Sequence, residues 1–137
     1  MPAVVLEVLD GIAPFAAAEA VENVPGAEIV AVEATEVRLA LAHVEGLSAV
    51  LGLRTPVAAY RSLVFDVVRP RSLRSPDHMQ EVAAATVDLQ RRARPARFGS
   101  FRLSAAGRDS EDLVMWCASF ASATGLAHDD EDGALLV

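Results

Sequence analysis

Residues 36–41 read Glu-Val-Arg-Leu-Ala-Leu, the clearest two-residue alternation in the chain. Apolar side chains at the odd positions alternate with charged or small side chains at the even positions. Because successive side chains of a strand point to opposite faces, this pattern predicts a β-strand with one buried face. Such a strand needs other elements to cover its apolar face, and the flanking sequence supplies candidates.

The flanking residues predict an α+β unit around this strand. Its expected elements, in chain order, are a strand over 4–9, a helix from Pro14 to the stop at Pro25-Gly26, strands over 28–32 and 36–41, a short helix within 43–52 and a strand over 57–68. The first helix has spaced positions at Phe15, Ala18 and Val21 or Glu22. The order β-α-β-β-α-β fits a ferredoxin-like unit over residues 1–68.

Residues 69–137 predict a second unit. Its expected elements are a basic loop over 69–74, a helix from Pro76 capped by Ser75, a strand over 101–104, a helix from Asp109 or Ser110 to Gly125, and a terminal strand from Ala134. Helical spacing predicts that Trp116 and Phe120 belong to the core, together with Phe101 from the strand. A strand interrupted at Val137 predicts that the natural chain continues.

Composition limits the class of protein. The 137 residues suffice for one ordinary domain or two very small ones, and the net charge is −7. Apolar runs are far shorter than the ~20 residues of a membrane span, and residues 1–10 lack the basic start of a signal peptide. The single cysteine cannot form an internal disulfide, so we expect a cytoplasmic protein without a membrane partner.

Charge is distributed unevenly along the chain, and all 12 basic residues are arginine. Residues 1–53 carry eight acids and one arginine, whereas residues 54–108 carry eleven arginines and four acids. Residues 109–137 carry seven acids and no base. The chain therefore has a basic middle between two acidic ends, and its average charge conceals a candidate surface for an anionic partner.

Several short stretches match one known family in order and spacing. They are Gly11, a helix carrying Glu19, Pro25–Val30, the segment Leu53-Arg54-Thr55-Pro56-Val57-Ala58-Ala59-Tyr60-Arg61, Phe101–Arg108, the helix over 110–124, Thr124-Gly125-Leu126, and an acidic turn before Leu135–Val137. Taken together, and over essentially its whole length, the chain resembles the N-terminal region of THUMP-domain RNA methyltransferases.

The resemblance implies a ferredoxin-like domain over 1–68 and a THUMP-like RNA-binding domain over 69–137, incomplete at its C-terminal end. It also implies a parent enzyme that uses S-adenosylmethionine to methylate N2 of guanine, usually in tRNA. The family's catalytic domain carries a Pro-Pro motif, but this chain has no adjacent prolines and no Gly-x-Gly. We therefore expect RNA as the partner, with S-adenosylmethionine and all catalytic residues outside residues 1–137.

Arginines just before and just after the helix that starts at Pro76 are the main candidates for RNA contacts, because a guanidinium binds phosphate without regard to sequence. The two ends of this helix are about 25 Å apart, so the arginines can follow one extended RNA without forming one pocket. A solvated surface with cations at helix ends is the alternative interpretation. The candidate residues are Arg69, Arg71, Arg74, Arg91, Arg92, Arg94, Arg97, Gly107 and Arg108.

Gly107 and Arg108 precede a helix, where a close backbone approach would favour an anion, although an ordinary turn is the alternative. The aromatic residues near the arginines that could stack on bases are Tyr60 and Phe98. The acidic run His128–Asp132 predicts a solvated turn and no metal site, because adjacent acids point in different directions.

Nothing in the sequence predicts a catalytic site. Cys117 lies on an apolar helix face with no basic residue near it in the sequence, which predicts a buried structural thiol. His78 is predicted to be a surface residue. Two functions therefore remain open: an RNA-binding module of a methyltransferase, or a small interaction or ligand-sensing module that dimerises through a sheet edge and binds no RNA.

Overall fold

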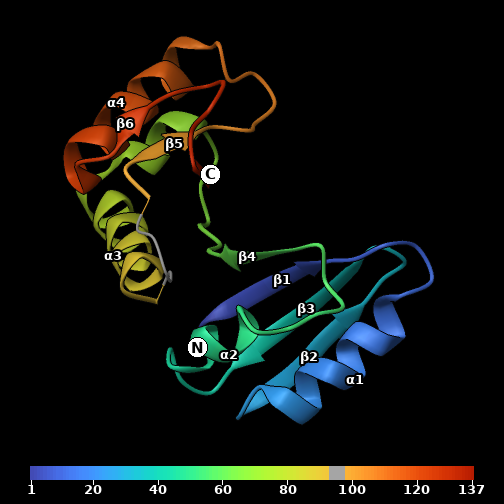
Figure 1. Ribbon diagram of the computed structural model, residues 1–137. Coiled ribbons are helices and arrows are strands. Elements are labelled where there is room, and N and C mark those ends of the chain that lie inside the picture. The colour runs from blue at the N-terminus through green and yellow to red at the C-terminus, as the bar shows by residue number, and fades with distance from the viewer. Residues whose placement is uncertain (93–97) are drawn as a thin grey trace. The chain divides into compact units, whose positions relative to one another are not determined.

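A computed structural model of the chain describes residues 1–92 and 98–137 (Figure 1). The chain divides into two compact units, Met1–Leu63 and Val64–Val137. The division lies five residues before the boundary expected after residue 68. Each unit has its own cluster of buried apolar side chains, so each is described separately. None of the helices in the described ranges has the length and apolarity that a membrane span requires.

The first unit is a four-stranded antiparallel sheet with two helices. Its elements are β1 (Ala3–Glu7), α1 (Ala13–Asn23), β2 (Ala27–Val32), β3 (Glu36–Leu41), α2 (Gly46–Val50) and β4 (Ala58–Ser62). The strand order is β2-β3-β1-β4, so the alternating stretch at residues 36–41 forms an interior strand. The α+β class and the expected order of elements are confirmed.

One face of this sheet forms the core of the first unit. Val4 lies opposite Leu39 and Leu6 lies opposite Val37 in the β1–β3 register, and all four side chains are buried. The side chains that alternate with these four along β1 and β3 point to the other face of the sheet, which explains the alternation seen in the sequence. α1 runs along the sheet and packs against β2 and β3 (Figure 1).

The buried face of α1 differs from the one that residue spacing suggested. Ala13, Ala16 and Ala20 are each at most 2% exposed, whereas Phe15 and Val21 are 67% and 58% exposed. Small alanine side chains let the helix approach the sheet closely, and the larger side chains are left on the outer face. The helix thus has two apolar faces, and the sequence pattern marked the outer one.

The strand expected over 57–68 is wrong beyond Ser62, where β4 ends. Phe65 already belongs to the second unit, and its ring lies beside that of His78 in the same unit, with the ring centroids 4.8 Å apart. Val64 and Val68 are almost fully exposed. The apolar composition of this segment therefore resembles a strand, but no described strand pairs with it.

Glu19 connects α1 to the segment that leads into β4. Its two carboxylate oxygens accept hydrogen bonds from the backbone N–H groups of Arg54 (2.8 Å) and Thr55 (2.9 Å). Hydrogen bonds from the Thr55 hydroxyl and from these two N–H groups lower the pKa of Glu19 below its ordinary value. The Leu-Arg-Thr segment is therefore held by a carboxylate 35 residues earlier in the chain.

The second unit is a three-stranded parallel sheet with two long helices. Its elements are a 3₁₀ helix η1 (Pro70–Arg74), α3 (Pro76–Arg92), β5 (Ser100–Arg102), α4 (Glu111–Thr124), β6 (Ala127–His128) and β7 (Leu135–Leu136). The strand order is β6-β5-β7. β6 was not expected, because two residues are too few to show a periodic pattern. The basic loop over 69–74 is helical rather than irregular.

Phe101 and Phe120 are the two fully buried aromatic side chains of this unit. Their rings meet edge to face at 4.7 Å, and the Trp116 ring stacks on Phe120 at 5.0 Å. α4 begins at a Ser110 cap that accepts a hydrogen bond from Leu113 N–H, and it ends at Gly125 in the left-handed conformation. The predicted core residues and both predicted helix ends are confirmed.

The turn between β6 and β7 passes directly against β5. Gly133 is buried, and a Cβ at this position would overlap the carbonyl group of Phe101. Asp129 fixes the turn, since its Oδ1 accepts hydrogen bonds from the N–H groups of Glu131 and Asp132. Only glycine allows the turn to approach the strand this closely.

Replacing Glu19 with Gln should lower the free energy of unfolding by about 1 kcal/mol at neutral pH, because a neutral acceptor binds the two N–H groups less strongly. The lowered pKa means that the wild-type advantage is complete above the ordinary pKa of glutamate and disappears as the pH falls through the lowered value. Urea unfolding at several pH values measures this. Glu28→Gln, on exposed β2 sequence, is the control, and equal losses in both variants would contradict the account.

Replacing Gly133 with Ala should destabilise the second unit by about 3 kcal/mol, because the added methyl group forces the turn away from β5. Gly99→Ala is the matched control, since a Cβ there meets no atom within 4 Å. Thermal unfolding followed by tryptophan fluorescence reports on this unit through Trp116. A Gly133→Ala variant as stable as Gly99→Ala would show that the turn does not need glycine.

Candidate nucleic-acid interface

Arg69 and Arg71 are presented by the start of η1. Arg69 has an extended backbone and Pro70 begins the 3₁₀ helix, as its fixed φ allows. Both arginine side chains belong to exposed residues. Neither Arg69 nor Arg71 forms an ion pair with a carboxylate of the described residues 1–92 and 98–137.

Arg74 has a different environment from its two neighbours. It is half-buried, its Nη1 lies 3.5 Å from the Met115 sulfur, and its Nε is buried without a hydrogen-bond partner. The guanidinium therefore packs η1 against α4. Of the three η1 arginines, Arg74 is the least available for an external phosphate.

Arg91 and Arg92 lie in the last turn of α3, where cations are favoured by the helix dipole. A helix of 17 residues is about 25 Å long, so these residues lie at the far end of α3 from η1. Arg91 is exposed and Arg92 is half-buried. The candidates Arg94 and Arg97 lie outside the described residues.

Gly107 and Arg108 form an exposed turn before α4. Gly107 has φ +70°, and a hydrogen bond from Ser110 N–H to the Gly107 carbonyl oxygen closes the turn from Gly107 to Ser110. A Cβ at Gly107 would meet nothing within 4 Å, so glycine serves the backbone angle and not a close approach. The first turn of α4 also carries Glu111 and Asp112, whose charges disfavour an anion at this helix end.

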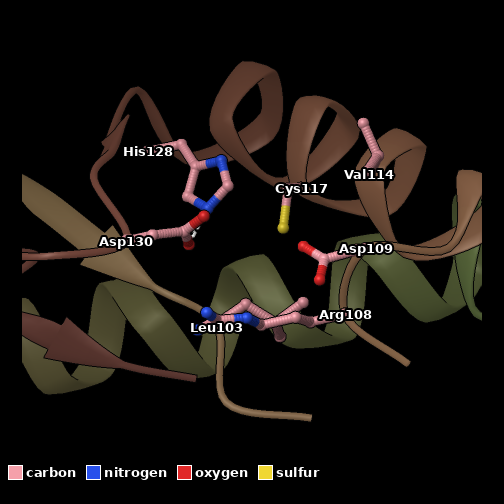
Figure 2. A pocket seen from close by; sticks show the side chains of 7 residues that line it. All are labelled: Leu103, Arg108, Asp109, Val114, Cys117, His128 and Asp130. Carbon is pink, nitrogen blue, oxygen red and sulfur yellow. Dashed lines mark hydrogen bonds and ion pairs between the residues drawn. The ribbon is translucent and has the colours of Figure 1, made fainter. Parts of the chain in front are cut away.

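Arg108 lines a pocket of about 50 Å³ that the sequence did not predict (Figure 2). The pocket residues come from the end of β5, the start of α4 and the turn after β6, and they are Leu103, Arg108, Asp109, Val114, Cys117, His128 and Asp130. Arg108 thus shares its pocket with two carboxylates. This surrounding makes it a weaker phosphate ligand than Arg69 or Arg71.

Cys117 is buried, as predicted, and the pocket brings it together with a histidine and an arginine that are not near it in the sequence. Figure 2 shows the Cys117 sulfur pointing into the pocket from α4, with His128 on one side and Asp109 on the other. His128 Nε2 lies 2.6 Å from Asp130 Oδ1, and its ring stacks on Phe101. No sequence signal marked this cluster, because β6 was not predicted.

The chemistry of this pocket is that of a protonated thiol. Burial, and secondarily the charge of Asp130, raises the pKa of Cys117. The thiol is therefore neutral at pH 7 and a poor nucleophile. No group of three or more His, Cys, Asp or Glu side chains within the described ranges is arranged to hold a metal ion.

The aromatic candidates for base stacking are both engaged elsewhere. Tyr60 belongs to β4 of the first unit, and its hydroxyl donates a hydrogen bond to Glu7 Oε2 at 3.0 Å. Phe98 packs partly buried against the core of the second unit. His78, expected on the surface, is half-buried, and its Nδ1 lies 2.9 Å from the Ser72 carbonyl oxygen. The candidate interface therefore consists of charged side chains and not of aromatic rings.

Comparisons with known proteins found no relative of this chain. No family model, no curated protein and no solved structure matches the chain.

The Cys117 thiol should react with a maleimide at pH 7 at least about tenfold more slowly in the folded protein than in urea, because its raised pKa and burial suppress the thiolate. The matched control is Cys117→Ser combined with Ala118→Cys, which places a thiol on the exposed neighbouring position. Labelling followed by mass spectrometry measures both rates. Equally fast labelling of Cys117 and the exposed thiol would contradict a buried, protonated thiol.

Proposed function

We propose that this chain is an RNA-binding module that holds tRNA or a similar structured RNA by its phosphates. The observation that carries the proposal is the pair Arg69 and Arg71, two exposed guanidinium groups within three residues that no carboxylate neutralises in the described part of the chain. Arginine forks match phosphate oxygens, and each contact releases a counterion from the RNA.

The local arrangement of charge supports a phosphate-binding surface more than the net charge does. Residues 64–137 carry nine arginines and eleven acids, so the second unit is slightly acidic overall. Six of the eleven acids lie in the first turn of α4 and in the turn after β6. The exposed arginines Arg69, Arg71 and Arg91 lie near the two ends of α3, which itself carries Asp77, Glu81 and Asp88. The other exposed arginines among the described residues of this unit are Arg102 and Arg108.

Arg91 provides a second point of contact in this proposal. It is exposed at the end of α3 opposite η1, and its position in the last turn leaves its charge projecting from the helix. A separation of about 25 Å along α3 matches several nucleotides of RNA rather than one phosphate. The surface therefore suits a long anionic partner better than a small anionic metabolite.

The wider assignment is also a proposal. The antiparallel β2-β3-β1-β4 sheet and its element order support a ferredoxin-like first unit, and the β5-α4-β6 crossover supports a THUMP-like second unit. In that case the parent protein is a cytoplasmic RNA methyltransferase acting on guanine N2. S-adenosylmethionine and the reacting atoms would belong to another part of it, and residues 1–137 would position the RNA.

Replacing Arg69 and Arg71 together with Gln should weaken tRNA binding on the order of tenfold at low salt, because two phosphate contacts are lost. The plot of log affinity against log salt concentration should also become shallower by about 1.5 to 2. Fluorescence anisotropy with labelled tRNA, titrated with protein at salt concentrations of about 50–200 mM, measures both the affinity and the salt slope.

Arg38→Gln is the matched control, because Arg38 is a half-exposed arginine of the first unit already paired with Glu36 at 3.2 Å. It should leave the affinity and the salt slope unchanged. If the wild-type chain binds no tRNA at low salt, or if its binding is insensitive to salt, the proposed function is wrong.

A further inference from the structure

The outer face of α1 exposes apolar side chains with no partner in the described part of the chain. Phe15 is 67% exposed and Val21 is 58% exposed, and Ala18 lies exposed between them. The opposite face of the same helix is already covered by the sheet through its alanines. An exposed phenylalanine and valine on one short helix form a surface suited to another apolar surface.

The spacing of this face is self-complementary. Phe15 and Val21 lie three residues before and three residues after Ala18. If two copies of α1 pack antiparallel with Ala18 against Ala18, Phe15 of each copy lies level with Val21 of the other. Ala18 has the smallest side chain of the three, so the two helices can approach closely where they cross.

The charges at the two ends of α1 are complementary in the same arrangement. No side chain caps the N-terminal turn and none of its residues is acidic, so no carboxylate of the turn offsets the positive end of the helix dipole. Glu22 is exposed near the C-terminal end of the same face. Antiparallel packing places Glu22 level with Pro14 of the other copy, in that uncompensated first turn.

We propose that α1 is the interface of a two-fold symmetric dimer, in which the outer face of one copy packs antiparallel against the same face of a second copy. A second copy fits because one surface supplies both apolar halves and both charges of the contact. Glu19, the remaining acid of the helix, is turned toward Arg54 and Thr55 and does not enter the face. The dimer therefore buries no unpaired carboxylate of Glu19.

The β2 edge of the first sheet is a poorer interface than α1. β2 is an edge strand, but a bulge interrupts its register between Ile29 and Ala31, and it exposes Glu28. Bulges and edge charges are features that prevent strands from pairing between molecules. A helix of 11 residues is about 16 Å long, so the α1 contact is small and the dimer should dissociate on dilution.

Sedimentation velocity of the full chain over a wide concentration range tests the dimer. Wild type should shift from monomer to dimer as concentration rises, and Phe15→Ser with Val21→Ser should raise the dissociation constant at least about tenfold. Val30→Ser is the matched control, because Val30 is a 65% exposed valine of the same unit outside the proposed face. It should leave the dissociation constant unchanged.

The arrangement of the two helices is tested by Ala18→Cys. The new thiol should form an intermolecular disulfide under mild oxidation, whereas Val30→Cys should not. A wild-type chain that stays monomeric, a dimer indifferent to the Phe15 and Val21 changes, or equal cross-linking at residues 18 and 30 would overturn the proposal. These measurements contain no RNA, so their outcome is separate from that of the RNA proposal.

Discussion

The second unit depends on the packing around the buried ring of Phe101. It lies on β5, the central strand of a sheet whose strands are only two or three residues long. Its ring touches Phe120 from α4 on one side and stacks on His128 from β6 on the other. Gly133 passes against its carbonyl group on the way to β7. Short strands supply few ladder hydrogen bonds, so this aromatic packing replaces much of the cohesion of a longer sheet.

The same arrangement determines where charge can be exposed. Arg108, Asp109 and Asp130 line one pocket, between the start of α4 and the turn after β6. η1 is held on α4 through Arg74 and Met115, and this contact leaves Arg69 and Arg71 projecting from the preceding residues. Arg74 is therefore packed on α4 and Arg108 shares a pocket with two carboxylates, whereas Arg69 and Arg71 are exposed without an ion pair among the described residues. In the proposed function, Arg69 and Arg71 are the residues that contact RNA phosphates.

Elements with strong periodicity or clear caps were predictable from the sequence. The 36–41 strand alternates because one sheet face is buried, and α4 has both a Ser110 cap and a Gly125 end. The prediction failed where a pattern was too short or ambiguous. Two-residue β6 has no period, and α1 has two apolar faces, so its pattern does not reveal which of them meets the sheet. The alanine face of α1 is the buried one because its small side chains let the helix pack closely on the sheet.

The candidate site was only partly predictable for a related reason. Local composition identifies exposed arginines well, as at Arg69 and Arg71, but it does not show which distant residues lie beside an arginine in the folded chain. Arg74 packs on Met115, which lies 41 residues later in the chain, and Arg108 shares a pocket with Asp130. The pocket around Cys117 combines residues 103–130, and only the folded chain brings them together.

We propose that RNA phosphates bind beside η1 and at the end of α3. The most direct measurement is a titration of ¹⁵N-labelled protein with tRNA, followed by amide chemical shifts. The account predicts that the largest changes fall at residues 69–74 and 91–92, while the amides of β1 and β3 stay unchanged. Changes concentrated in the first unit, or no changes at saturating tRNA and low salt, would contradict it.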